Sequence, residues 1–420
     1  MNVLIVSEGY PPDGGGVATS AARIAKNLAS CGCRVVVVTY DRARSYDFIS
    51  PQRVDEDEAV TVVRIGPLLP VDGATNGPAA IAKQKASLRR RFVDHALNEM
   101  DSMAFSPDIV FSMYLLNAGF LATFLAKRLK VPHVAGIRGN DIGRNLFEPE
   151  SLYATSFVLD HADAIVSVNA HLKDRTLDAF PRLSGKTLVV PNAIDAVARV
   201  DRAAARRELV ERTGWPSDSL ILCFNGAFRE KKGAFEILAA FGRLQDEGSR
   251  ARLLIVGDAT GAVERAAAGP LLDRLVRGGT LVTTGQVERS AVPRLIAAAD
   301  VLLMPSLDDG LANGLLEGMA CGLCPLVSAL FADTVDNGRT GLVLDRVTPE
   351  RIVGAIRSLD ADREATAGMG DAAQRAAAGW SPRQEAGSYL ALFTRLLAAG
   401  RADGGADSIA GSGGAVPCAA

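Results

Sequence analysis

The length, composition and charge of the chain exclude several classes of protein. It has 420 residues, of which 48% are hydrophobic and 22% charged, a balance typical of globular proteins and unlike that of disordered, collagenous or disulfide-rich chains. The 46 lysines and arginines and the 48 aspartates and glutamates leave a formal charge of −2, and only 5% of the residues are aromatic. We therefore expect no nucleic-acid partner.

The sequence shows no targeting or membrane-spanning segment. The apolar run at residues 3–6 has no basic region before it and is too short for a signal peptide, and no apolar run approaches the roughly 20 residues that span a bilayer. Cys321 and Cys324 form a C-x-x-C pair but lack the second pair or histidine cluster of a zinc site. We therefore interpret the cysteines as buried thiols and expect a cytoplasmic protein.

Short apolar runs alternate with helical patterns along the first half of the chain. The runs that predict strands are residues 3–6, 34–39, 60–65, 109–112, 134–137, 164–168 and 187–190. The patterns that predict helices are residues 17–31, 71–103 and 121–129. This alternation indicates an α/β fold whose parallel sheet is covered on both faces and doubly wound.

The same rhythm restarts after a pause at residues 191–199. Strands are predicted at residues 220–224, 253–256, 281–283, 301–304, 325–328 and 341–344, and helices at 201–213, 234–246, 290–298 and 314–321. We predict two doubly wound Rossmann-like domains, residues 1–195 and 196–380, that face each other across a cleft. Residues 381–399 predict a helix that could pack back on the first domain, and the Gly/Ala/Ser-rich residues 400–420 predict a disordered tail.

Two glycine-rich loops follow predicted strands and precede helices. The first contains Gly14, Gly15 and Gly16, where backbone N–H groups and the helix dipole could hold an anion, although a plain tight turn is the alternative. The second runs from Gly226 to Gly233 and contains Arg229 and Lys232. Cations are unfavourable at a helix N-terminus unless they bind an anion such as a diphosphate; a solvated basic turn is the alternative.

A third loop brings carboxylates to the start of a helix. Residues 305–322 read PSLDDGLANGLLEGMACG, with Asp309 in the loop and Glu317 in the helix. Carboxylates can accept hydrogen bonds from sugar hydroxyls, and loop N–H groups at a helix start can hold phosphate.

Two D-x-D triplets offer a competing metal-binding signature, at residues 55–57 and 360–362. Neither lies beside a glycine-rich or basic loop. We therefore interpret both as solvated acids of loops or helix ends and predict no metal.

Taken together, these motifs resemble those of the retaining GT-B glycosyltransferases of family 4, over residues 1 to about 399. Residues 305–322 are similar to the family's P-S-x-x-E-G…E-A-M-A-x-G element, and residues 190–195 to its I-P-N-G-V-D hinge motif. The resemblance implies that Asp309 contacts the donor sugar, that Glu317 contacts the nucleotide ribose, and that Arg229 and Lys232 hold the diphosphate. It also implies donor or substrate contacts from Gly15, Gly16, Asn140, Asp141, Gly226, Gly285, Val287, Gly310, Leu311, Ala312 and Asn313.

The chain departs from the family pattern at several of these positions. Asp309 stands where the family has glutamate, and Ala227 where it has an arginine. Arg138 replaces a histidine that many members carry after the strand at residues 134–137. Arginine cannot act as a general base, so we expect Arg138 to fix the donor sugar or its phosphate, and we expect nearby His133 to lie in the core or at the surface.

The predicted activity is retaining transfer of a sugar from a nucleotide diphosphate-sugar to a hydroxyl acceptor, without a cofactor. The alternatives are a nucleotide-sugar epimerase or a phosphorylase on the same fold, or a non-catalytic nucleotide-sugar-binding subunit. Residues 81–93 combine basic and apolar side chains and could contact the inner face of a membrane, although a solvated helix face is the alternative.

Overall fold

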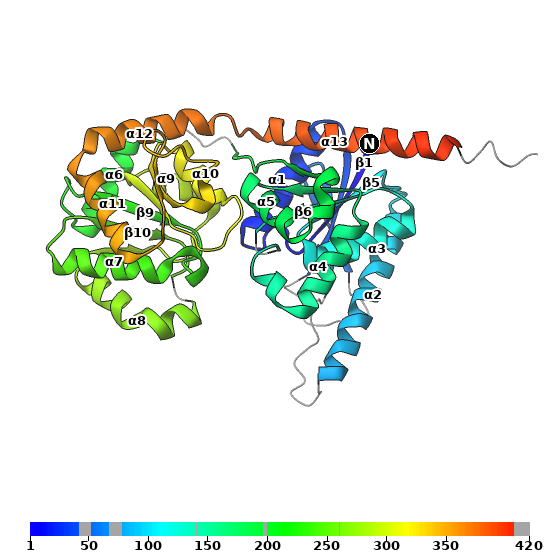
Figure 1. Ribbon diagram of the computed structural model, residues 1–420, viewed down its shortest axis with the longest axis horizontal. Helices are drawn as coiled ribbons and strands as arrows, with labels where there is room; N and C mark the ends of the chain where they lie inside the picture. The colour runs from blue at the N-terminus through cyan, green and yellow to red at the C-terminus, as the bar shows by residue number, and fades with distance from the viewer. Residues whose placement is uncertain (42–51, 67–77, 140, 196–199, 260, 407–420) are drawn as a thin grey trace, which may run out of the picture.

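The computed structural model describes residues 1–41, 52–66, 78–139, 141–195, 200–259 and 261–406. The chain forms two parallel sheets flanked by helices, one in each of two Rossmann-like domains that lie side by side (Figure 1). The predicted fold class is confirmed.

The N-terminal sheet has the strand order β3-β4-β2-β1-β5-β6-β7-β8. Its strands are β1 (Asn2–Ser7), β2 (Arg34–Tyr40), β3 (Gln52–Asp57), β4 (Val60–Ile65), β5 (Ile109–Met113), β6 (His133–Ile137), β7 (Ala164–Ser167) and β8 (Thr187–Val189). The helices are α1 (Gly16–Ser30), α2 (Pro78–Ser102), α3 (Phe120–Leu129), α4 (Pro149–His161) and α5 (Ala170–Ala179), with short helical turns η1 (Leu115–Gly119), η2 (Arg144–Phe147) and η3 (Pro181–Lys186). Continuous apolar runs are buried on both faces of the central strands, as the parallel arrangement requires.

Strand β3 corrects one sequence prediction. Residues 55–57 are not loop or helix-end acids, because they lie on β3, which pairs antiparallel with β4 at the sheet edge. Asp55 forms an ion pair with Arg64 at 2.7 Å, and Asp57 forms one with Lys26 at 2.9 Å. These pairs stabilise a charged edge strand of the kind that discourages pairing with another chain. The other triplet does lie at a helix end, where Asp362 caps the next helix.

The C-terminal sheet has the strand order β11-β10-β9-β12-β13-β14. Its strands are β9 (Ile221–Asn225), β10 (Arg252–Val256), β11 (Leu281–Thr283), β12 (Val301–Met304), β13 (Cys324–Ser328) and β14 (Leu342–Leu344). Its helices are α6 (Arg202–Thr213), α7 (Ala234–Asp246), α8 (Ala262–Arg277), α9 (Val292–Ile296), α10 (Asn313–Ala320), α11 (Pro349–Ala361) and α12 (Arg363–Ala377), with short turns η4 (Glu230–Lys232), η5 (Arg289–Ala291) and η6 (Ala329–Phe331).

The long helix α13 (Pro382–Ala406) leaves the C-terminal domain and packs against α1 of the N-terminal domain (Figure 1). Tyr389 and Phe393 enter the N-terminal core beside Phe111, at ring-centroid distances of 4.9 and 6.1 Å. Arg23 of α1 and Glu385 form a buried two-bond ion pair, both bonds 2.9 Å long. The helix continues to Ala406, seven residues into the segment expected to be a disordered tail, and residues 407–420 lie outside the described residues.

Most of the cysteines among the described residues are buried, as expected, and Cys418 lies outside the described residues. Cys33, Cys223, Cys321 and Cys324 are buried, whereas Cys31 is exposed at the end of α1, which corrects the prediction for that residue. Within the described part of the chain, no helix has the length and hydropathy to cross a membrane.

Candidate functional site

The first glycine loop leaves the start of α1 accessible. Gly15 lies directly before α1 at φ +107°, a conformation that favours glycine. A Cβ added at Gly14 or Gly15 would meet no atom within 4 Å, and Gly14, Gly15 and Gly16 are all exposed. The first N–H groups of α1 therefore border open space, as an anion site at a helix N-terminus needs.

The loop after β6 is organised by a buried carboxylate. Asp141 is completely buried and accepts hydrogen bonds from the backbone N–H of Arg138 (2.5 Å) and of Leu115 (3.3 Å). Burial raises the pKa of Asp141 to about 7, although both hydrogen bonds act in the opposite direction. Asp141 thus shapes the loop from inside the domain, while its predicted neighbour Asn140 lies outside the described residues.

The guanidinium of Arg138 is held by groups from three parts of the chain. It donates to Asn192 Oδ1 at 3.0 Å and to the Tyr389 hydroxyl of α13 at 3.1 Å, and it contacts Met113 Sδ at 2.9 Å. It also lies over the Phe111 ring, 5.8 Å from the centroid. Arg138 therefore connects the hinge at Asn192 with the returning helix.

The second glycine loop places its two predicted cations differently. Gly226 and Gly233 have φ of +125° and +78°, which lets the chain turn tightly between β9 and α7. Lys232 Nζ lies 3.3 Å from Asp309 Oδ2, and both side chains are more than four-fifths buried. Arg229 instead pairs with Asp258 at 2.9 Å, and both partners are partly exposed. Lys232 is therefore the cation that the fold sets against the predicted sugar-contacting acid.

Glu317 is fixed in the first turns of α10. Its Oε2 accepts a hydrogen bond of 2.7 Å from Asn225 at the end of β9, and its Oε1 lies 3.4 Å from Arg289. Burial raises the pKa of Glu317, while Arg289 and Asn225 oppose the shift. The carboxylate is thus oriented for a further hydrogen-bond donor such as a sugar hydroxyl.

Close backbone contacts join the two domains beside these groups. A Cβ added at Gly139 would lie 2.9 Å from the Gly310 nitrogen, and one added at Gly310 would collide with the Arg138 carbonyl oxygen. The Asn313 side chain approaches Ser20 Oγ (3.3 Å) and the Gly16 carbonyl oxygen (3.5 Å). Glycine at residues 139 and 310 lets the third loop of the C-terminal domain lie directly against the N-terminal domain.

The remaining predicted residues line or support the same region. Leu311 packs in an apolar cluster with Ile137 and Ile142 of the N-terminal domain, and Ala312 belongs to the C-terminal core. Gly285, at φ +67°, forms an isolated bridge with Gly257, and partly buried Val287 packs on the C-terminal core. Leu311 and Ala312 therefore contribute apolar packing. Gly285 and Gly257 contribute a backbone contact between two loops.

Sequence reasoning missed Arg289 as a site residue. Arg289 reaches from η5 to Thr19 Oγ1 of α1 at 3.3 Å, and it lies 3.8 Å from Asp195 at the hinge as well as beside Glu317. Its position two residues after Val287 was the available signal. Asn192 was also left out of the site, although the hinge motif contained it; its Nδ2 donates to the Leu311 carbonyl oxygen at 2.8 Å.

His133 lies in the core of the N-terminal domain, one of the two places expected for it. It is 2% exposed and lies 3.0 Å from Ser112 Oγ. Burial lowers its pKa to about 3, with a smaller effect from Lys186.

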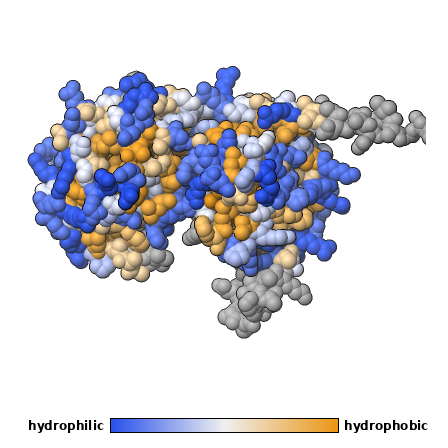
Figure 2. All heavy atoms as spheres, viewed as in Figure 1, coloured by the Kyte–Doolittle hydropathy of each residue, from blue (hydrophilic) through white to orange (hydrophobic). Residues whose placement is uncertain are grey.

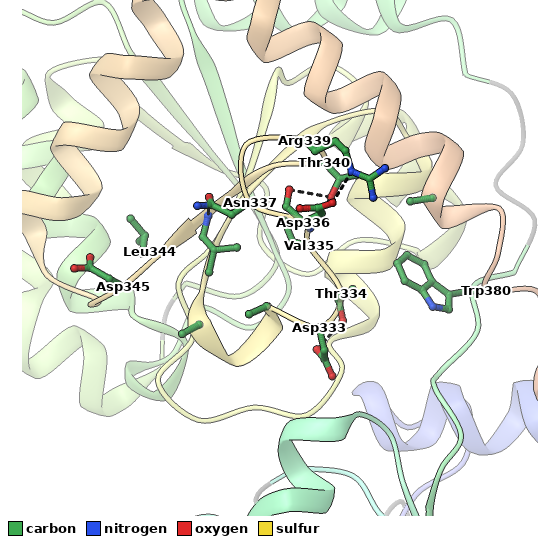
Figure 3. Close-up of a pocket in the computed structure, with 14 residues that line it drawn as sticks. Asp333, Thr334, Val335, Asp336, Asn337, Arg339, Thr340, Leu344, Asp345 and Trp380 are labelled. Atoms are coloured by element: carbon green, nitrogen blue, oxygen red, sulfur yellow. Dashed lines mark hydrogen bonds and ion pairs between the residues drawn. The ribbon is translucent and has the colours of Figure 1, made fainter.

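A pocket of about 470 Å³ lies elsewhere in the C-terminal domain (Figure 3). Asp336, Arg339 and Thr340 approach one another on one side of it, and Trp380 lines it near the chain that leads to α13. Its lining contains none of the predicted site residues. Across the described residues, no group of three or more His, Cys, Asp or Glu side chains is placed to hold a metal ion.

Comparison with known proteins identifies the class to which this geometry belongs. Residues 15–193 match the family described as "Glycosyl transferase 4-like domain", and residues 205–376 match "Glycosyl transferases group 1". The sucrose-phosphate synthase of Thermosynechococcus elongatus superimposes with a TM-score of 0.75 at 18% identity, covering 95% of this chain and 99% of that one. HepE of Anabaena, in complex with UDP and glucose, gives 0.71 at 16% identity, covering 94% and 100%.

Two curated relatives are similar in sequence. The D-inositol 3-phosphate glycosyltransferase of Geodermatophilus obscurus is 28% identical over 91% of this chain and 85% of its own length. The putative teichuronic acid biosynthesis glycosyltransferase TuaC of Bacillus subtilis is 25% identical over 56% of each chain, so this match spans little more than half of that relative. The chain belongs to the GT-B glycosyltransferases of the family 4 type, and it is a transferase enzyme.

Proposed function

We propose that the enzyme transfers a sugar from a nucleotide diphosphate-sugar to a hydroxyl acceptor, with retention at the anomeric carbon. The observation that carries this proposal is the largely buried ion pair of Lys232 with Asp309, 3.3 Å apart, at the loop that leads into α10. A lysine beside a carboxylate can bind the two halves of such a donor, since the ammonium attracts phosphate while the carboxylate accepts from sugar hydroxyls.

The groups around this pair match the rest of the donor. Glu317, oriented by Asn225, would accept from the ribose hydroxyls, and the backbone at Gly285 would meet the base. The first N–H groups of α1 directly follow exposed Gly15. They would bind the diphosphate from the side of the N-terminal domain. Complexes of HepE with UDP and with UDP-glucose support a uridine nucleotide as the first donor to test.

Departure of the diphosphate is the step in which these residues would act. The bond from the anomeric carbon to the β-phosphate oxygen breaks, and Lys232, Arg229 and the N–H groups of residues 310–313 stabilise the charge that develops on that oxygen. Asp309 orients the sugar ring. The acceptor oxygen then bonds to the anomeric carbon on the same face, and its proton passes to the leaving phosphate oxygen.

Arg138 and Asp141 would support the acceptor side of this reaction. Arg138 is held by Asn192 and Tyr389, so it fixes the hinge, and Asp141 shapes the loop next to it. Each is proposed to set the shape of the cleft rather than to transfer a proton.

A donor panel tests the proposal directly. The purified chain is incubated with nucleotide diphosphate-sugars and simple alcohol or glycan acceptors, nucleoside diphosphate release is measured, and the anomeric configuration of the product is read by NMR. The expected result is release with at least one donor and an unchanged configuration. An inverted product would overturn retention, and free epimerised donor would favour an epimerase.

The same assay tests the absence of a metal requirement. Because Lys232 and Arg229 are proposed to neutralise the diphosphate in place of a metal ion, the release rate is expected to be unchanged by EDTA. A rate that EDTA abolishes and Mg²⁺ or Mn²⁺ restores would contradict this part of the proposal.

A further inference from the structure

An aromatic strip on α3, η2 and α4 of the N-terminal domain combines three exposed rings with the partly buried rings of Phe120 and Phe157. We define the strip as Phe120 and Phe124 of α3, Phe147 of η2, and Tyr153 and Phe157 of α4. Adjacent rings of α3 and α4 are in contact, with centroids 5.0 Å apart for Phe120 and Phe124 and 5.7 Å apart for Phe124 and Phe157. Tyr153 lies one helical turn before Phe157, so both side chains share a face of α4.

The exposure of this strip is unusual for a soluble enzyme. Phe147 is 88% exposed, Tyr153 75% and Phe124 45%. Together with Leu152 they make up four of the eight exposed large hydrophobic side chains in the described part of the chain. Hydrophobic residues gathered on neighbouring surface elements mark an interaction site. Figure 2 shows hydrophobic residues among hydrophilic ones on the visible face of this domain.

Cations border the strip on the α3 side. Lys127 and Arg128 follow Phe124 by three and four residues, so they lie on the same side of α3, and both are exposed. The Arg89 guanidinium of α2 lies over the Phe120 ring, 5.2 Å from its centroid. Figure 1 shows α2, α3 and α4 beside one another. Positive charge therefore lies on the α3 side of the strip, whereas exposed Glu148 and Glu150 lie beside its other end at the start of α4.

The structure also revises what residues 81–93 can contribute to membrane contact. Phe92 is buried in the core under β4, and Val93 packs against the same core. The apolar side of this part of α2 is therefore occupied by its own domain. Its arginines can attract anionic headgroups, but the apolar anchor has to come from the neighbouring helices.

We propose that the aromatic strip docks the enzyme on an anionic lipid bilayer. Aromatic side chains are favoured at the level of the headgroups, and exposed lysine and arginine are attracted to anionic lipid. Phe147 lies only four residues after Gly143 of the loop that contacts the other domain, so docking would bring the acceptor side of the cleft close to the bilayer. The inference goes beyond the proposed function and holds whichever donor the enzyme uses.

Vesicle co-sedimentation of the full chain tests the proposal. The parent is expected to pellet with phosphatidylcholine vesicles that contain phosphatidylglycerol, more weakly with phosphatidylcholine alone, and less as salt is raised. The double variant F147S/Y153S should lower the partition constant about tenfold because it removes two exposed aromatic anchors. The double variant K127Q/R128Q should lower it about fivefold per cation.

The control is Val276→Ser, which removes an exposed apolar side chain (44%) from α8 of the C-terminal domain, away from the strip, and should leave partitioning unchanged. Thermal unfolding of every variant checks that its fold is kept. Equal partitioning of the parent and F147S/Y153S would overturn the proposal. So would a parent that does not pellet but forms a dimer, detected by sedimentation velocity, that F147S/Y153S dissociates. A parent that pellets with the vesicles but releases no nucleoside diphosphate from any donor would count against the proposed function alone.

Discussion

The two domains present different kinds of groups to the region where they meet. The C-terminal domain contributes charged side chains in short-range partnerships, such as Lys232 with Asp309 and Glu317 with Asn225. The N-terminal domain contributes exposed glycine backbone at the start of α1 and a loop shaped from within by fully buried Asp141. Charge that remains partly accessible can respond to a ligand, whereas a buried carboxylate mainly fixes shape. Under the proposed function, the C-terminal domain would bind and activate the donor while the N-terminal domain would set the geometry of the acceptor side.

The largest effect is expected from Lys232→Ala. Removing the cation from beside the leaving phosphate should lower kcat about 10³-fold, the upper range for loss of one preorganised group that stabilises developing charge. Initial rates of nucleoside diphosphate release measure it. Lys231→Ala, which removes a cation from the same turn, is the matched control and should retain most of the activity. Comparable losses in both variants would show that general basicity of the loop, and not the pair with Asp309, is what matters.

Glu317→Gln is expected to weaken donor binding about thirtyfold. The substitution keeps the size of the side chain but removes the charge that strengthens a hydrogen bond from a ribose hydroxyl, a difference of about 2 kcal/mol. The effect should appear in KM for the donor and leave KM for the acceptor unchanged. Glu288→Gln, at an exposed acid of the same domain, serves as the control. An effect on acceptor KM instead would break the proposed division of labour.

Gly310→Ala should reduce kcat/KM about tenfold by a different route. Its Cβ would collide with the Arg138 carbonyl oxygen, so the third loop must retreat from the N-terminal domain, and small displacements of catalytic groups are costly. Gly354→Ala on α11, where an added Cβ meets no atom within 4 Å, should be fully active. A fully active Gly310→Ala enzyme would mean that turnover does not require the close approach of Gly310 to the Arg138 carbonyl oxygen.

The smallest expected effect is a pH dependence of the stability, caused by a buried histidine of the N-terminal domain. Because the folded-state pKa of His133 is about 3 and its ordinary value is 6.5, the unfolded chain binds a proton below pH 6.5 that the folded chain does not. This histidine's contribution to stability is therefore present above pH 6.5 and is lost as the pH falls toward 3. Because of this histidine, lowering the pH from 7 to 5.5 should lower the free energy of unfolding by about 1 kcal/mol. Urea unfolding of the parent and of His133→Gln at both values measures it; equal pH dependence would contradict the assigned burial.

The fold was largely predictable because most of its strands are short apolar runs. This is the sequence pattern expected for a parallel sheet that is buried on both faces. The exception, β3, shows the limit of this signal. Residues 52–57 read QRVDED, and an edge strand held by ion pairs to Lys26 and Arg64 has no need of apolar alternation. The ion-pair partners of β3 lie on α1 and β4, so no local sequence pattern predicts them.

The candidate site was predictable where a motif is continuous in sequence. Lys232, Asp309 and Glu317 belong to two continuous strand–loop–helix segments: Lys232 lies in η4 after β9, Asp309 in the loop after β12, and Glu317 in α10. The contacts of Arg289 and Arg138 were not predictable in this way. Arg289 reaches Thr19, and Arg138 reaches Tyr389, 270 and 251 residues away in the chain. Such contacts join elements that are far apart in the chain, so they form only when the two domains and α13 pack together.

The return of α13 makes the first half of the chain an incomplete folding unit. Tyr389 and Phe393 of α13 form part of the core of this half, and Arg23 of α1 forms a buried ion pair with Glu385 of α13. During synthesis, the strands of the N-terminal sheet therefore leave the ribosome before the α13 side chains that complete their core. The whole C-terminal domain is synthesised in between. For the same reason, a chimaera that exchanges N-terminal domains between relatives should exchange Pro382–Ala406 along with them.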